Sequence, residues 1–293
     1  MVAMTSENER WSSLAARGTR VTRLLLAAAV ICALLEAAPA YAAHPLISDD
    51  TLTQGKGKFQ VESSYKYDRD DDNGVKTQTS QPQIQLTYGI LDPLDFIVTA
   101  PYLFVRTEQG GNTTSVDGFG DVTVALKWRF YGEKEKGLQF AVKPSLTFPT
   151  GDEQKGLGAG QSSPGASHFY KFDRQSYGAT FIGTYEKEEW CVSINLGYQH
   201  NHYGLQSDED AYRHDIWSAS LSGQYEIIED VWIVGEAGLL RNPDKTSDTP
   251  PAYINAGVIY ELRKNIDLDV GYKHGLNKPS VDSTISGAVT VRF

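Results

Sequence analysis

Apolar residues occupy every second position in one segment after another of the chain beyond residue 57. In the clearest segment, Val122, Val124, Leu126, Trp128 and Phe130 alternate with small or polar residues. Successive side chains of a β-strand point to opposite faces of a sheet, so this period of two predicts strands with one apolar and one polar face. The sequence therefore indicates an all-β protein.

Twelve such segments follow one another, an even number. They lie at residues 58–67, 83–90, 96–104, 121–131, 138–148, 177–185, 190–198, 217–225, 231–239, 252–262, 266–272 and 285–293. Short links alternate with longer polar connections at residues 68–77, 106–118, 150–173, 204–212, 242–249 and 275–283. This alternation predicts an up-and-down antiparallel sheet with tight turns at one end and loops at the other.

The length of the alternating segments separates two possible architectures. Strands of soluble proteins are typically about 5 to 6 residues long, whereas a tilted strand needs about 9 to 11 residues to cross a bilayer. Most of these segments fit the longer value, and a sheet that faces hydrocarbon must close because its edges cannot bond to water. We therefore predict a transmembrane β-barrel of about 12 strands over residues 58–293, with short periplasmic turns and longer extracellular loops. The alternative is a soluble sandwich with its apolar face inward.

The N-terminal region has the pattern of a secretory signal peptide. Four arginines precede the apolar run Leu24–Leu35, and small residues follow it. The run is too short for a membrane-spanning helix. We expect a signal peptide over residues 1–42, then a short periplasmic N-terminal segment over residues 43–57.

The charge balance bears on possible partners. The chain has 27 Lys and Arg residues against 37 Asp and Glu residues, a formal net charge of −10. Nucleic-acid binding requires a positive surface that displaces counterions from phosphates. We therefore expect no nucleic-acid partner.

Several short motifs resemble those of a known family. They are residues 44–50 (HPLISDD), 88–90 (YGI), 118–121 (GFGD), 148–152 (FPTGD) and 156–160 (GLGAG). Together they resemble the outer-membrane β-barrel family labelled "putative transporter of the MetA pathway of phenol degradation". The resemblance implies a transport-related barrel in the outer membrane of a Gram-negative bacterium, connected with aromatic compounds.

The last residue, Phe293, ends an apolar row that contains Val289 and Val291. This arrangement resembles the terminal-strand signal that outer-membrane barrels present to the barrel assembly machinery. We therefore expect Phe293 to be an assembly signal, and we expect the partners to be outer-membrane lipid, the assembly machinery and a small-molecule solute.

Charged residues between apolar neighbours are candidates for the lining of a polar lumen. They are Lys127, Arg129, Lys143, Glu236, Glu261, Asp267, Asp269 and Lys273. Basic residues from one part of the chain would then oppose acidic residues from another. Such a lumen could hold a transverse electric field that orients a polar solute, or it could be filled by mutually neutralising pairs.

The longest predicted loop, residues 150–173, is rich in glycine. It could fold into the lumen as a constriction, or it could be a surface loop. The residues that we assign to such a constriction are Thr150, Gly151, Asp152, Gly156, Leu157 and Gly158.

These features favour a channel or transporter for the passive uptake or efflux of a small solute, with hydrophobic and aromatic compounds as candidates. His200, His202 and His214 suggest two further readings, a transition-metal site or a barrel enzyme that acts on lipid, and a sealed structural or adhesive barrel is a third alternative. No nucleophile motif accompanies the histidines. We therefore expect no enzyme activity, and we assign no catalytic residue, metal ligand or cofactor.

Overall fold

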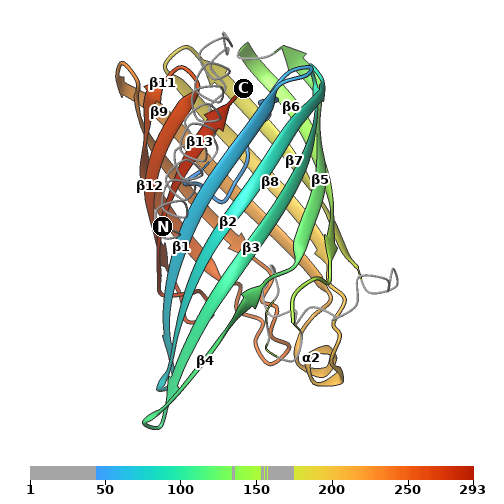
Figure 1. Ribbon diagram of the computed structural model, residues 1–293, viewed down its shortest axis with the longest axis vertical. Coiled ribbons are helices and arrows are strands. Elements are labelled where there is room, and N and C mark those ends of the chain that lie inside the picture. The colour runs from blue at the N-terminus through green and yellow to red at the C-terminus, as the bar shows by residue number, and fades with distance from the viewer. Residues whose placement is uncertain (1–43, 134–135, 153–154, 156, 158–174) are drawn as a thin grey trace, which may run out of the picture. The chain divides into compact units, whose positions relative to one another are not determined.

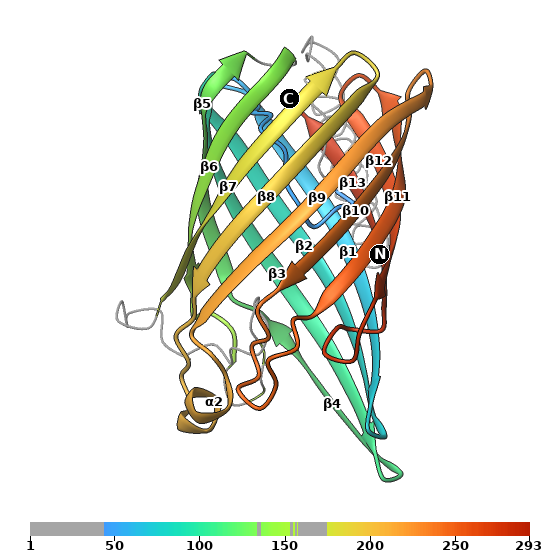
Figure 2. The same cartoon turned by 180° about the vertical axis from the view of Figure 1, so that it is seen from behind.

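The strands of the computed structural model form a closed ring, as Figures 1 and 2 show. The structure describes residues 44–293 except 134–135, 153–154, 156 and 158–174. Every strand pairs antiparallel with its neighbours, and β1 closes the ring by pairing with β13. The strands are β1 (Phe59–Asp72), β2 (Val75–Leu91), β3 (Leu94–Gln109), β4 (Asn112–Phe119), β5 (Val122–Glu133), β6 (Lys136–Phe148), β7 (Ser176–Lys187), β8 (Trp190–His200), β9 (Asp215–Ile228), β10 (Val231–Leu240), β11 (Ala252–Arg263), β12 (Ile266–Gly275) and β13 (Ser283–Arg292).

The thirteen strands occupy twelve positions in the wall, because β4 and β5 share one. The first half of β3, from Leu94 to Thr99, pairs with β5, and its second half, from Tyr102 to Gln109, pairs with β4. Gly120 and Asp121 separate β4 from β5. The predicted fold, a twelve-stranded antiparallel barrel, is confirmed.

The apolar rows face outward and the polar rows face inward. On β9, Leu221 is 57% exposed while its neighbour Ser222 is 5% exposed. On β8, Ile194 is 45% exposed and Asn195 is 7% exposed. A soluble sandwich would bury the apolar row, so its pattern would be the reverse of this one. The exposed apolar band is the surface that an outer-membrane barrel presents to lipid.

Two of the predicted loops are instead long hairpins. Where residues 68–77 were expected to form a loop, β1 and β2 continue to a tight turn at Asn73 and Gly74, whose φ angles are 52° and 81°. Where residues 106–118 were expected to form a loop, β3 and β4 continue to Gly110 and Gly111. Paired residues with positive φ fit the two-residue turns that match strand twist. Figure 1 shows both hairpins extending beyond the other strands at its lower end.

The same end of the barrel carries the loops between β8 and β9 and between β10 and β11, with a short helix, α2 (Gln206–Ala211). Arg213 joins two of these loops, because its guanidinium donates hydrogen bonds to the carbonyl oxygens of Asn242 and Ser247 at 3.0 and 2.9 Å and pairs with Asp248 at 2.7 Å. Within the described part of the chain, no helix is long and apolar enough to cross a membrane.

Candidate functional site in the barrel lumen

Residues 44–54 run inside the barrel and contact inward-facing side chains of most of the wall, whereas residues 55–57 lie beside the turn between β2 and β3, where the Lys56 N–H donates to Asp92. The interior position of residues 44–54 differs from the periplasmic placement expected for residues 43–57. The contacts extend from β12 and β10, through β8, β7 and β6, to β5 and β3. We call residues 44–54 the lumen segment.

The start of the lumen segment contacts the acidic part of the wall. The His44 imidazole pairs with the Asp269 carboxylate on β12. The Glu236 carboxylate on β10 accepts hydrogen bonds from the backbone N–H groups of Ile47 and Ser48 at 2.8 and 2.9 Å. These carboxylates lie at the barrel interior, where each needs a hydrogen-bond donor, and the segment supplies the donors.

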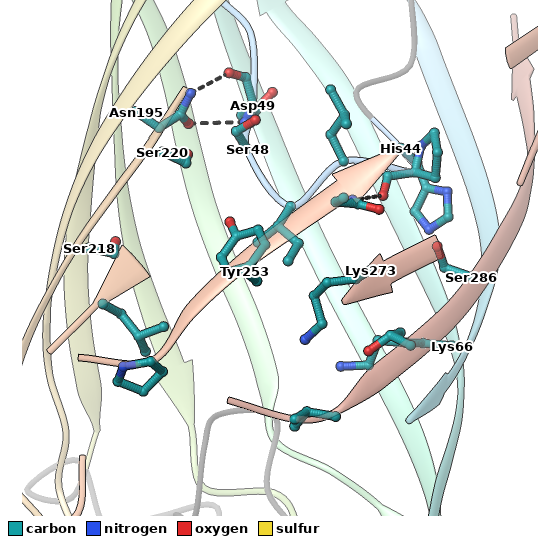
Figure 3. A pocket seen from close by; sticks show the side chains of 18 of the residues that line it. His44, Ser48, Asp49, Lys66, Asn195, Ser218, Ser220, Tyr253, Lys273 and Ser286 are labelled. Atoms are coloured by element: carbon teal, nitrogen blue, oxygen red, sulfur yellow. Dashed lines mark hydrogen bonds between the residues drawn. The ribbon is translucent and has the colours of Figure 1, made fainter. Parts of the chain in front are cut away.

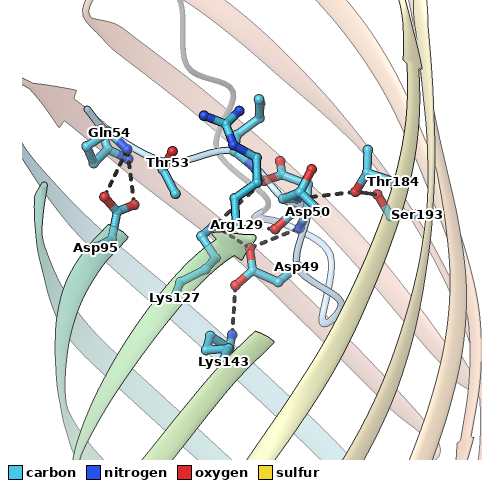
Figure 4. Close-up of polar contacts among 12 residues, drawn as sticks. Asp49, Asp50, Thr53, Gln54, Asp95, Lys127, Arg129, Lys143, Thr184 and Ser193 are labelled. Atoms are coloured by element: carbon cyan, nitrogen blue, oxygen red, sulfur yellow. Dashed lines mark hydrogen bonds and ion pairs between the residues drawn. The ribbon is translucent and has the colours of Figure 1, made fainter. Parts of the chain in front are cut away.

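Asp49 makes the opposite contact with the basic part of the wall (Figure 4). Its carboxylate lies 3.1 Å from Nζ of Lys127 on β5 and 2.7 Å from Nζ of Lys143 on β6. Burial alone would raise the pKa of Asp49, but the two ammonium groups hold it well below its usual range. The Asp49 carboxylate therefore stays charged between the two lysines.

The electrostatic environment of the Asp50 carboxyl group differs from that of Asp49. Burial raises the pKa of Asp50 to about 6; Lys127 opposes this shift and the neighbouring charge of Asp49 adds to it. Lys127 is 3.7 Å away, farther from Asp50 than from Asp49. One lysine is thus shared unequally by two adjacent carboxyl groups.

The segment then continues along the wall through hydrogen bonds. The Thr51 backbone N–H donates to the Thr184 hydroxyl at 3.2 Å, and the Thr51 hydroxyl donates to the Gln139 side chain at 3.1 Å. The Gln54 backbone N–H donates to the Asp95 carboxylate (Figure 4). Both Thr51 and Gln139 are fully buried. The lumen segment is therefore an integral part of the barrel interior.

One apolar cluster adds to these contacts. Leu46 lies with Trp232, Val234 and Ile259, all of them buried. Trp232 is only 4% exposed and faces the interior, although it lies near the start of its strand. Its ring covers apolar surface beside Leu46 instead of lipid.

The structure places the eight predicted lumen residues in two groups. Lys127, Lys143, Glu236 and Asp269 contact the lumen segment directly. The others lie elsewhere on the inward rows: Arg129 donates to Gln139, Glu261 lies near the short turn after β11, Asp267 pairs with Arg292, and Lys273 lies over the Tyr253 ring. The sequence predicted that basic and acidic lumen residues lie on different strands. It did not predict that the lumen segment contacts both groups.

Two cavities flank the lumen segment. The larger, about 510 Å³, reaches the loop end, where Leu240, Pro251 and Val281 line it. The smaller, about 220 Å³, reaches toward the short turns, where Gln60, Thr87 and Asp95 line it. Both are lined by the segment from His44 to Asp49 (Figure 3 shows the larger). Residues 44–49 therefore lie between the two.

Thr150 and Gly151, two of the residues assigned to a constriction loop, form hydrogen bonds beside the break between β4 and β5. The Thr150 hydroxyl donates to the Gly120 carbonyl and accepts from the Val122 N–H, both at 2.9 Å, and the Gly151 N–H donates to the Asp121 carboxylate at 2.9 Å. The GFGD motif (residues 118–121) and the FPTGD motif (residues 148–152) are therefore hydrogen-bonded to each other where β4 ends and β5 begins.

The start of this loop then turns back on itself. The backbone N–H of Leu157 donates to the Asp152 carbonyl, and the Leu157 side chain is fully buried. Neither cavity is lined by Thr150, Gly151, Asp152 or Leu157. Gly156 and Gly158 lie outside the described residues, as do residues 159–173.

The three histidines come together at the loop end. The rings of His200 and His214 are stacked with centroids 5.6 Å apart, and the His202 ring lies 5.6 Å from that of His200. Asp215 pairs with His200 Nδ1 at 2.8 Å. Among the described residues, no serine hydroxyl bonds to any of the three rings, and no group of three or more His, Cys, Asp and Glu side chains is arranged to hold a metal ion.

Comparisons with known proteins agree with this architecture. An outer-membrane channel from Pseudomonas putida F1, described as a COG4313 channel, has a similar fold, with a TM-score of 0.62, 13% identity and coverage of 85% of this chain and 100% of its own. The KdgM porin has a TM-score of 0.51, 9% identity and coverage of 80% and 99%. No curated protein matches the sequence. The model of a family described as "Putative MetA-pathway of phenol degradation" matches residues 43–293.

Proposed function

Given that the chain belongs to the family described as "Putative MetA-pathway of phenol degradation", and that it is an outer-membrane barrel of a Gram-negative bacterium, we propose that it is a channel for the passive passage of a small solute. The lumen segment is its closing element. The family description names phenol degradation, so aromatic compounds are the first solutes to test.

The observation that carries this proposal is the pair of cavities on either side of the lumen segment. They reach toward opposite ends of the barrel and share seven lining residues: His44, Leu46, Ile47, Ser48, Asp49, Gln83 and Lys143. A barrel with only a structural role would not require two cavities that are separated by residues 44–49 alone. Removing or displacing residues 44–49 would join the cavities into one passage.

The contacts of the segment suit a closure that can open. Most are hydrogen bonds and ion pairs to polar wall residues, which water replaces when the segment leaves. Each hydrogen bond then has a net worth of about 0.5–1.5 kcal/mol. In this proposal Lys127, Lys143, Glu236 and Asp269 hold the segment, while Arg129, Glu261, Asp267 and Lys273 set the charge of the remaining wall. The constriction role of residues 150–158 and the assembly role of Phe293 stay predictions.

The lipid-enzyme alternative has less support. His200 and Asp215 form a pair, but a hydrolase of this kind also needs a serine hydroxyl within hydrogen-bond reach of the imidazole. Phospholipid hydrolysis by the purified barrel that disappears in a variant with His200, His202 and His214 all changed to alanine would favour the enzyme over the channel.

Planar-bilayer recording and solute flux into liposomes test the proposal. We expect the full barrel to give rare or small conductance steps, and a variant lacking residues 44–54 to give larger and longer-lived ones. Both preparations must first show the heat-modifiable gel mobility of a folded barrel. Absence of conductance and flux in both would contradict the channel.

A further inference from the structure

The larger cavity has an uneven distribution of charge. Its acidic, basic and imidazole lining side chains are His44, Asp49, Lys66, Lys143 and Lys273. His44 is paired with Asp269, and Asp49 is paired with Lys143. The two remaining side chains are both lysines. Lys66 pairs with Asp68 outside the lining, so Lys273 is the charged side chain of the described lining that has no ion-pair partner.

These two lysines lie close together on the wall. Lys66 on β1 pairs in register with Ser286 on β13, and Lys273 on β12 pairs with Thr284, two residues before Ser286. Adjacent strands are about 4.8 Å apart, so β1 and β12 are separated by about 10 Å with β13 between them. Figure 3 shows both amines directed into the same space.

The two amines differ in their protein partners. Nζ of Lys66 lies 3.3 Å from the Asp68 carboxylate, which also accepts a hydrogen bond from Thr284. Nζ of Lys273 lies 5.8 Å from the centre of the Tyr253 ring, and no carboxylate of the described residues lies within ion-pair distance of it. An ammonium group in a confined cavity favours an anionic partner.

The rest of the lining indicates the body of that partner. Leu240, Pro251, Pro279 and Val281 contribute apolar surface, while serine hydroxyls contribute hydrogen-bonding groups. A cavity of about 510 Å³ lies within the ordinary range for small organic ligands. An inorganic anion would leave the apolar surface unused, and an uncharged solute would leave Lys273 unpaired.

We propose that Lys273 and Lys66 form a binding site for a small organic monocarboxylate with an apolar or aromatic body. The carboxylate lies between the two amines, and the apolar body lies toward Leu240 and Val281. This inference deepens the proposed channel function by naming a solute class, and it rests on that function only for the passage of the bound solute.

Calorimetric titration of the folded barrel in detergent tests the site without requiring transport. Benzoate is the probe, and benzamide is its uncharged counterpart of nearly the same shape. We expect benzoate to bind at least tenfold more tightly than benzamide. Lys273→Gln should weaken benzoate binding at least tenfold, and the double variant with Lys66→Gln should abolish it.

Lys76→Gln is the matched control, because Lys76 is an exposed lysine on the β1–β2 hairpin. It should bind benzoate as the unaltered protein does. Equal binding of benzoate and benzamide, unchanged binding in the double variant, or no benzoate binding at all would overturn the site.

Flux measurements separate this proposal from the channel proposal. Benzoate binding without benzoate flux or ion conductance would contradict the channel proposal and support the binding-site proposal. Conductance without benzoate binding would contradict the binding-site proposal and support the channel proposal.

Discussion

Replacing Asp49 by asparagine perturbs the lumen segment at its most highly charged contact. The change keeps the shape of the side chain but removes the carboxylate that lies 3.1 Å from Lys127 and 2.7 Å from Lys143. The Lys127 side chain is 9% exposed, so it would lose its nearest counter-charge while largely shielded from water. The Lys143 side chain is 29% exposed and regains more hydration.

The size of the effect follows from these two environments. Removing one partner of a buried ion pair costs about 3–5 kcal/mol, and a partly exposed pair is worth about 1 kcal/mol or less. Lys127 keeps Asp50 at 3.7 Å, so the lower end of the first range applies. A loss of about 3 kcal/mol shifts the docking equilibrium of the segment by about a hundredfold.

Single-channel recording measures this shift as the ratio of time spent in the high- and low-conductance states. We expect Asp49→Asn to raise that ratio by about two orders of magnitude. Asp71→Asn is the control, since it removes a carboxylate from the exposed β1–β2 hairpin. If Asp49→Asn records like Asp71→Asn in a correctly folded barrel, the ion pairs do not hold the channel closed and the reasoning is refuted.

Two further predictions concern pH and the wall. Burial raises the pKa of Asp50 to about 6. Burial alone would lower the pKa of His44, but the hydrogen bond to Asp269 and the charges of Asp269 and Glu62 together raise it. Both groups therefore release protons when the segment leaves its docked position, so the open time should increase from pH 5 to pH 7.5. Asp50→Asn should flatten this pH profile. A decrease in open time over the same range would contradict the pKa shifts assigned to the docked segment. On the lipid face, Leu221→Arg should lower the free energy of unfolding in vesicles by about 2–4 kcal/mol, measured by urea titration. Ser220→Arg, which faces the larger cavity, should cost much less, and equal losses would show that the two faces are wrongly assigned.

The barrel could be predicted from the sequence because its wall obeys one local rule. The period of two in segments such as Val122–Phe130 fixes both the strand and the face that meets lipid, and no distant contact changes that outcome. The exceptions have local causes too. The hairpin at Asn73 and Gly74 was assigned to a loop because its flanking residues are polar, although the Asn-Gly pair is itself a turn signal.

The interior of the lumen could not be predicted in the same way. Residues 44–54 lack a strand or helix period, and their position depends on partners such as Glu236 and Asp269, which lie about 190 to 225 residues away in the sequence. The separation of basic strands from acidic strands was the available signal. A short segment that carries His44 and Asp49 at opposite ends complements that separation, but sequence spacing alone does not reveal it.

A reversible disulfide between the lumen segment and the wall tests the central claim most directly. The Thr51 backbone N–H lies 3.2 Å from the Thr184 hydroxyl, so Thr51→Cys and Thr184→Cys place two thiols near each other. A Cys191→Ser background removes the free cysteine of the described residues. We predict that oxidation suppresses conductance and solute flux and that a reducing agent restores both in the same membrane. Equal conductance in the oxidised and reduced states, with the cross-link verified by mass spectrometry, would contradict a lumen segment that opens and closes the channel.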